Sequence, residues 1–144
     1  MKTQYTFESN KFQSTLAEQD ESHEDFINPG IYGRELANYL ITELQVHKYR
    51  VCFHCPEDWG YWIEIEHDRG YTLGFGCSNI DHVDPNINLN LHRVFVTPDK
   101  SVIRPMKHWF RKVNVHKDVE KLVATIGTIL SCDEQISNIA LESI

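Results

Sequence analysis

Two glutamates in the middle of the chain have a spacing that permits acid–base catalysis. Glu64 and Glu66 lie two residues apart in an alternating segment, so on a strand they share one face, with roughly 6–7 Å between them. Paired carboxylates at such separations serve glycoside hydrolysis, and His54 and His67 are near in the sequence. Half-exposed strands also turn polar residues toward water without any catalysis. We favour this second interpretation, so the sequence predicts no catalytic residue, and a small enzyme is the less favoured alternative.

Two other groups contain side chains that can bind metals. Cys52 and Cys55 form a C-x-x-C pair, but no second C-x-x-C or H-x-x-x-H pair completes a zinc site. On a strand, residues three apart point to opposite faces, which separates the two thiols. His82 with Asp81 and Asp84 forms the other group, in a segment predicted to be a loop. We expect reduced cysteines, no metal and no cofactor.

Alternation after a predicted turn at residues 56–58 divides the segment 59–66 into two faces. One face is predicted to pack in the core and holds Trp59, Tyr61, Ile63 and Ile65. The other face holds Trp62 among acidic residues, and an aromatic side chain ringed by charges is typical of a protein-binding hot spot. The sequence therefore predicts a partner-binding surface made of Glu57, Asp58, Trp62, Glu64, Glu66 and Asp68.

The elements that carry this segment are predicted to follow the order (β)-α-β-β-β-β-α-β. Asn28-Pro29-Gly30 has the composition of a helix start, and a second apolar stripe predicts a helix from Asp118 to Ser131. Hairpins and a last strand over residues 136–141 complete an antiparallel sheet with helices against one face. At 144 residues, the chain is predicted to be a single α+β domain, 1–144.

Other segments are predicted to be irregular or closely packed. Residues 1–27 are acidic, and apart from a short strand at residues 5–7 we expect a loop or mobile arm there. Residues 79–88 are predicted to be a polar loop. Gly30 and Gly33 disfavour a helix by about 1 kcal/mol each, so we expect another backbone or a partner to approach closely there.

The charge of the chain limits the kind of partner. The 14 Lys and Arg face 21 Asp and Glu, and the net charge of −7 disfavours non-specific nucleic-acid binding and is compatible with a basic protein. Six of the 14 basic residues cluster in segment 100–117 with Trp109 and Phe110, so a nucleic-acid-binding α+β domain is the alternative function. No apolar run approaches the about 20 residues of a membrane helix, and the N-terminus lacks a signal-peptide pattern. We therefore expect a cytoplasmic protein that does not bind membranes.

Three strings of the sequence resemble a family of small, mostly uncharacterised bacterial proteins: Asn28-Pro29-Gly30-x-x-Gly33, Pro56-Glu57-Asp58-Trp59-Gly60 and Gly74-x-Gly76-Cys77-Ser78-Asn79. The resemblance covers about residues 28–96 and weakens through the last helix. The family is identified as one that includes immunity proteins of contact-dependent growth inhibition systems, which neutralise a toxin domain delivered by a neighbouring cell. The resemblance implies an inhibitor without catalytic residues, and the acidic composition is compatible with a nuclease toxin as the partner. It assigns no binding residues, so the predicted surface rests on the strand pattern alone.

Overall fold

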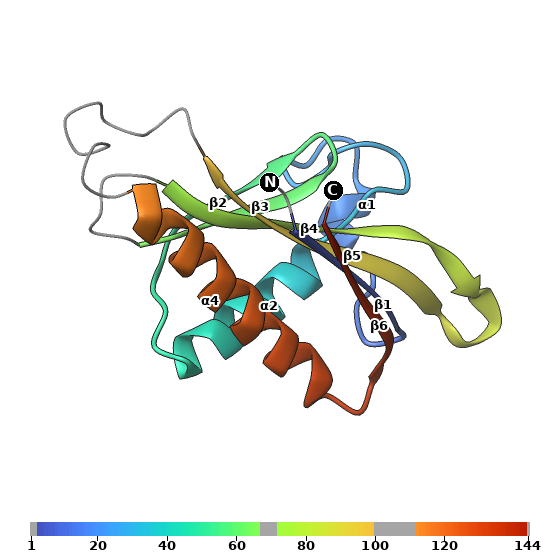
Figure 1. Ribbon diagram of the computed structural model, residues 1–144. Helices are drawn as coiled ribbons and strands as arrows, with labels where there is room; N and C mark the ends of the chain where they lie inside the picture. Colours follow the sequence, from blue (N-terminus) through green and yellow to red (C-terminus); the bar gives the residue numbers. More distant parts are fainter. Residues whose placement is uncertain (1–2, 67–71, 100–111, 144) are drawn as a thin grey trace.

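The computed structural model describes residues 3–66, 72–99 and 112–143 and has the α+β architecture predicted from the sequence. Its strands form a six-stranded antiparallel sheet in the order β2-β3-β4-β5-β1-β6 (Figure 1). The strands are β1 (Thr3–Ser9), β2 (Val51–Glu57), β3 (Gly60–Ile65), β4 (Thr72–Asp84), β5 (Leu89–Asp99) and β6 (Ile136–Ser143). The helices are α1 (Leu16–Gln19), α2 (Arg34–Val46), the 3-10 helix η1 (Pro85–Ile87) and α4 (Lys112–Ser131).

Both long helices cover the same face of the sheet. α2 packs against β3 and β4, and α4 packs against β5 and β6 (Figure 1). Side chains of both helices and of the sheet join in one buried core, which includes Phe7, Leu40, Ile63, Phe75 and Ile126. Burial alternates along β1 and β3 because successive side chains of a strand point to opposite faces. Within the described ranges, no helix is long and apolar enough to cross a membrane.

The N-terminal segment contributes a strand to the sheet and a side chain that caps α2. β1 lies between β5 and β6, and it extends the short strand predicted at residues 5–7. Where the sequence predicts a loop over residues 13–24, the structure has α1, which begins with a capping box between Thr15 and Glu18. The buried Glu18 carboxylate also accepts hydrogen bonds from the N–H groups of Gly33 and Arg34. α1 therefore supplies the cap of α2.

The first long helix begins later than predicted. The sequence places its N-cap at Asn28, but α2 begins at Arg34 with Gly33 as its N-cap. Gly30 has a φ of 78°, in the left-handed region that an α-helix excludes. The predicted close packing is confirmed at Gly33, where a Cβ atom would lie 2.8 Å from the carbonyl oxygen of Cys77. A Cβ atom on Gly30, by contrast, would meet no other atom of the described residues within 4 Å.

Several other elements are also longer than predicted, and the last strand, predicted over residues 136–141, is confirmed as β6. β2 continues through Pro56, which an edge strand tolerates because no neighbour needs the missing N–H. β4 continues to Asp84, through most of the predicted polar loop. α4 begins at Lys112 instead of Asp118, so it includes the end of the basic segment. Residues 100–111, with Trp109 and Phe110, lie outside the described ranges.

Candidate protein-binding surface

The face of the sheet opposite the long helices carries several aromatic side chains. Phe53 of β2 pairs with Glu64 of β3, and Trp62 of β3 pairs with Gly76, which in turn pairs with Phe95 of β5. Directly paired residues of an antiparallel sheet have their side chains on the same face. Phe53 is 50% exposed and Trp62 is partly exposed. We call Phe53, Trp59, Trp62 and Phe95 the aromatic patch.

Two glycines of β4 make room for the rings of the aromatic patch. A Cβ atom on Gly74 would overlap the indole of Trp62, with the Cη2 atom at 2.7 Å. A Cβ atom on Gly76 would overlap the ring of Phe95 and would lie 2.5 Å from Cη2 of Trp59. The ring centroids of Trp59 and Phe95 are 4.9 Å apart. The Gly74-x-Gly76 spacing therefore lets both indoles lie close over the backbone of β4.

Trp59 does not lie in the core, contrary to the alternation predicted from the sequence. It lies in the turn before β3, and Gly60, the first residue of that strand, has a φ of 154°. This conformation interrupts the regular alternation of faces, so the prediction fails one residue before the strand begins. Tyr61, Ile63 and Ile65 are buried, as predicted. Both tryptophans of the segment consequently lie on the same face.

Acidic side chains lie beside Trp62, as the sequence predicts. The indole N–H of Trp62 donates a hydrogen bond of 3.0 Å to Oε1 of Glu64. Cys55 pairs with Trp62 across β2 and β3, and its thiol lies 3.5 Å from Oε1 of Glu57. Glu57 itself is exposed. An aromatic side chain between two carboxylates is therefore present on this face.

The other predicted acidic residues are more dispersed. Asp58 is exposed in the turn between β2 and β3. Glu66 lies beyond the end of β3 and forms an ion pair of 3.1 Å with Arg50. Asp68 lies outside the described residues. Glu64 is bonded to the Trp62 indole and Glu66 to Arg50, so each of the two glutamates has its own partner.

The three strings of the family resemblance meet in one junction. The side-chain amide of Asn28 donates to the carbonyl oxygen of Asp58 at 2.9 Å, which joins the first string to the second. The Asn79 side chain accepts from the N–H of Tyr32 at 3.0 Å and donates to the carbonyl oxygen of Gly30 at 2.8 Å, which joins the third to the first. The Asn residues of the strings thus link the segment before α2 to the β2–β3 turn and to β4.

The glycines of the same strings allow backbones to approach each other. A Cβ atom on Gly33 or on Gly60 would collide with the carbonyl group of Cys77. The thiol of Cys77 is buried and lies 3.7 Å from the carbonyl oxygen of Gly33. The strings therefore position the start of α2 and the β2–β3 turn on β4, and in this way they hold the aromatic patch in place.

A cleft of about 470 Å³ at the β2 edge is lined by ionisable side chains that were not predicted to lie close together. Arg34 donates to the hydroxyl of Tyr61 and lies 3.4 Å from the Asp25 carboxylate. Nδ1 of His54 is 3.3 Å from the same hydroxyl, and the two rings are stacked. Since Arg34 can only donate, the hydroxyl is able to donate to His54. Burial raises the pKa of Tyr61 although Arg34 opposes the shift, so the phenol stays protonated at neutral pH.

This cleft does not assemble the acid–base group considered from the sequence. His54 stacks on Tyr61, whose neighbours along β3 belong to the core. Glu64 lies on the other face of β3, bonded to Trp62. No pattern in the sequence indicated the cleft, because its residues come from four separate segments and Tyr61 was assigned to the core by its strand position.

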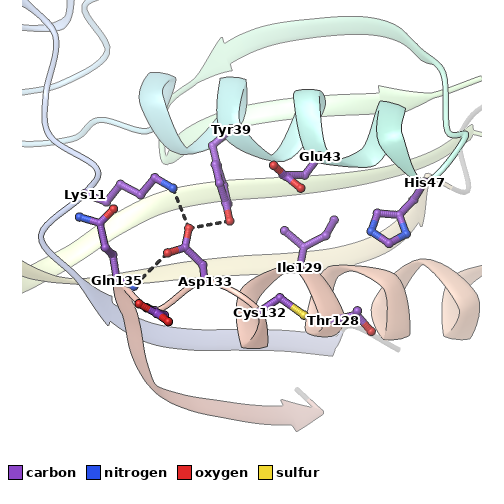
Figure 2. Close-up of a pocket in the computed structure, with 10 residues that line it drawn as sticks. Lys11, Tyr39, Glu43, His47, Thr128, Ile129, Cys132, Asp133 and Gln135 are labelled. Carbon is purple, nitrogen blue, oxygen red and sulfur yellow. Dashed lines mark hydrogen bonds and ion pairs between the residues drawn. The ribbon is translucent and has the colours of Figure 1, made fainter.

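A second cleft, of about 520 Å³, lies between α2, α4 and the segment that follows β1 (Figure 2). Asp133 accepts hydrogen bonds from Lys11 at 2.6 Å and from the Tyr39 hydroxyl at 2.8 Å. Burial and the adjacent Asp133 both raise the pKa of Tyr39. Burial would raise the pKa of Asp133, but hydrogen bonds from Lys11, Gln135 and Tyr39 outweigh it and lower that pKa. Lys11 and Asp133 compensate each other's charge, so we interpret the group of Lys11, Tyr39 and Asp133 as a structural junction.

The potential metal ligands do not come together in the described part of the chain. No three His, Cys, Asp or Glu side chains there are grouped to hold a metal ion. His82 instead lies 2.7 Å from the side chain of Asn90. Cys52 and Cys55 are free thiols. Burial, together with Glu57, raises the pKa of Cys55 to about 11, and burial with Glu64 raises that of Cys52, so neither is an activated thiolate.

No family model, curated protein or solved structure matches this chain. The resemblance to the family with immunity proteins therefore stays a prediction from its three strings. The structure adds that these strings contact each other. The aromatic patch and the charges around it are the features of this structure that bear on its function.

Proposed function

We propose that this chain is an immunity protein that binds a basic toxin domain, of the nuclease class, and blocks it by occupying its surface. The observation that carries the proposal is the aromatic patch on the face opposite the long helices, where Trp62 lies between Glu64 and Glu57. Large aromatic side chains dominate the binding energy of protein interfaces. Neighbouring carboxylates favour a partner with Lys and Arg at the matching positions.

The charges on this face indicate which end of the patch a basic partner contacts. Arg93 of β5 lies at one border, bonded to Ser78 at 2.8 Å and placed 5.8 Å from the ring centroid of Phe95. Glu57 and the half-exposed Phe53 lie on β2, at the opposite edge of the sheet. A cationic partner is repelled by the first border and attracted by the second. We therefore expect the contact to centre on β2, β3 and the turn between them.

The net charge of −7 and the family resemblance support the same class of partner. Opposite net charges accelerate encounter between proteins, often more than they increase final affinity. An inhibitor that must capture a toxin before it reaches its target benefits from fast association. The three strings resemble a family with immunity proteins, and this function requires a binding surface and no catalytic residue.

The test uses the gene immediately upstream of the one for this chain. The proposal expects that gene to encode a large secreted protein with a C-terminal domain that stops growth when expressed alone. Co-expression of this chain should restore growth, and the two purified proteins should bind with nanomolar to micromolar affinity. If co-expression does not restore growth and the two purified proteins do not bind, the proposal is refuted.

Charge reversal locates the surface within the same assay. Glu57→Lys should weaken binding most at low salt, whereas Glu134→Lys, an equally exposed change in the turn before β6, should leave affinity unchanged. Trp62→Ala should weaken binding about tenfold or more, as hot-spot tryptophans do. If the wild type binds and all three variants bind equally well, the surface is misassigned although the function holds.

A further inference from the structure

The hairpin of β4 and β5 extends beyond the rest of the sheet. The pairing of β4 with β3 ends at Cys77, and that of β5 with β1 ends at Asn90. From Ser78 onward, β4 therefore pairs with β5 alone. The end of the hairpin projects past both long helices, at the right of Figure 1. We call residues 80–87 the hairpin tip.

The hairpin tip carries three apolar side chains that are about half exposed. Ile80 is 45% exposed, Val83 44% and Ile87 55%. These are three of the seven large hydrophobic residues that are exposed in the described part of the chain, and they fall within eight residues. Scattered exposed apolar residues are ordinary, but a concentration on a projecting element marks an interaction site.

Polar side chains hold the hairpin tip in one conformation. Asp84 accepts a hydrogen bond from the N–H of Asn86 at 3.0 Å at the start of η1, and Asn88, in the left-handed region with a φ of 53°, ends it. The buried Asn90 bonds to His82 and to the carbonyl oxygen of Asn88. Since the backbone is already ordered, docking of the tip loses little conformational entropy.

The charge of the hairpin tip defines the chemistry of its partner. Asp81 and Asp84 lie between the apolar residues in the sequence, and the segment from residue 70 to 92 has neither Lys nor Arg. A second copy of this chain is a poor partner, because a symmetric contact between two tips would bring carboxylates against carboxylates. An apolar pocket bordered by Lys or Arg on a basic protein matches both properties.

We infer that the hairpin tip is a second docking element for the basic toxin domain, and that it binds there through its exposed apolar side chains, Val83 and Ile87 among them, at an apolar pocket with a basic border. This inference rests on the proposed function. Gly76, beneath the aromatic patch, and Val83 lie on the same strand, about 23 Å apart at the usual rise of a strand. One partner with an interface of about 800 Å² on each side is wide enough to contact both.

The test combines the C-terminal domain encoded upstream with a double variant of the tip, Val83→Ser/Ile87→Ser. Leu141→Ser is the matched control, because Leu141 is 54% exposed on β6 at the far edge of the sheet. The tip variant should bind the toxin domain about tenfold or more weakly, chiefly through faster dissociation, and the control should bind as the wild type does. Thermal unfolding and circular dichroism of all three proteins establish that folding is unchanged. If the double variant fails to fold, Ile87→Lys alone serves, since repulsion from the basic border should weaken binding at least as much.

The outcomes separate the two proposals. Wild-type binding with an unaffected, folded tip variant overturns this inference and leaves the proposed function intact. Failure of the wild type to bind overturns both. A concentration-dependent dimer of the isolated chain that the tip variant abolishes also overturns the inference, because the occupant is then a second copy. Protection of residues 80–87 from hydrogen exchange in the complex, together with weakened binding of the variant, supports it.

Discussion

Replacing Glu18 with Ala should destabilise this protein more than any single change on its surface. The Glu18 carboxylate is 4% exposed and accepts four hydrogen bonds. Oε1 accepts from the N–H and the hydroxyl of Thr15 at 3.0 and 3.1 Å, and Oε2 accepts from the N–H groups of Gly33 and Arg34 at 2.8 and 3.1 Å. One side chain thus closes α1 and caps the positive end of α2.

The magnitude follows from the groups that lose their partner. A hydrogen bond to a charged group contributes about 1.5–3 kcal/mol, and a buried N–H left unsatisfied costs a similar amount. The contributions within one network are not additive, and water can reach part of the gap left by the variant. We expect a loss of about 3–4 kcal/mol in the free energy of unfolding, a large part of the 5–15 kcal/mol typical of a domain.

Urea unfolding followed by tryptophan fluorescence measures this loss, with an unchanged m-value as the sign that the folded state is intact. Thr15→Ala is the matched control, since it removes the capping box of α1 but leaves the bonds from Glu18 to α2. It should cost about 1 kcal/mol. Glu18→Gln should fall between the two, because one oxygen acceptor remains. If Glu18→Ala costs no more than Thr15→Ala, the carboxylate does not hold α2 and the reasoning is refuted.

Three further changes test the packing. Burial lowers the pKa of His92 to about 4 from its usual 6.5. Above pH 6.5 the His92 imidazole is neutral in both the folded and the unfolded chain. Between pH 6.5 and 4 only the unfolded chain binds the proton. The free energy of unfolding should therefore decrease by about 3 kcal/mol as the pH is lowered through this window. Urea midpoints at several pH values measure the fall, and His92→Gln should flatten it. Gly76→Ala should lower the free energy of unfolding by about 1–3 kcal/mol, because the added methyl group overpacks the site, and it should change the fluorescence of Trp59. Ala in an open strand would instead raise stability, and that result would contradict the close contact. Asp133→Asn should lower stability by about 1–2 kcal/mol in thermal melts, and the loss should vanish in a Lys11→Met background if the ion pair causes it.

Sequence periodicity predicted the parts of the fold that depend on neighbouring residues. The alternation in β3 correctly placed Tyr61, Ile63 and Ile65 in the core and Trp62 with Glu64 on the other face. The element order follows from the same local signals, because a strand or a helix with one apolar face shows its period in the sequence. The cost of Gly33 in a helix start correctly indicated a close backbone contact.

The remaining features depend on contacts between distant segments. Trp59 was assigned to the wrong face because the φ of Gly60 is set by its packing against Cys77, seventeen positions later in the chain. The start of α2 moved to Arg34 because Glu18, from another helix, supplies the cap. The exposed Phe53 was overlooked, since a strand pattern alone does not show which edge of a sheet a strand occupies.

The residues that we propose for binding overlap the family strings only in part, since Glu57, Asp58 and Trp59 belong to the second string and the others lie outside the strings. Asn28 and Asn79 make internal hydrogen bonds, and Gly33, Gly60, Gly74 and Gly76 are packed against neighbouring backbone or rings. Phe53 and the hairpin tip, by contrast, are half exposed and lie outside the strings. A chain can therefore keep the strings, and with them the scaffold, while Phe53 and the hairpin tip change to fit another partner. A match to the strings predicts this scaffold, whereas the identity of the partner that we propose must be inferred from the exposed residues that the scaffold presents.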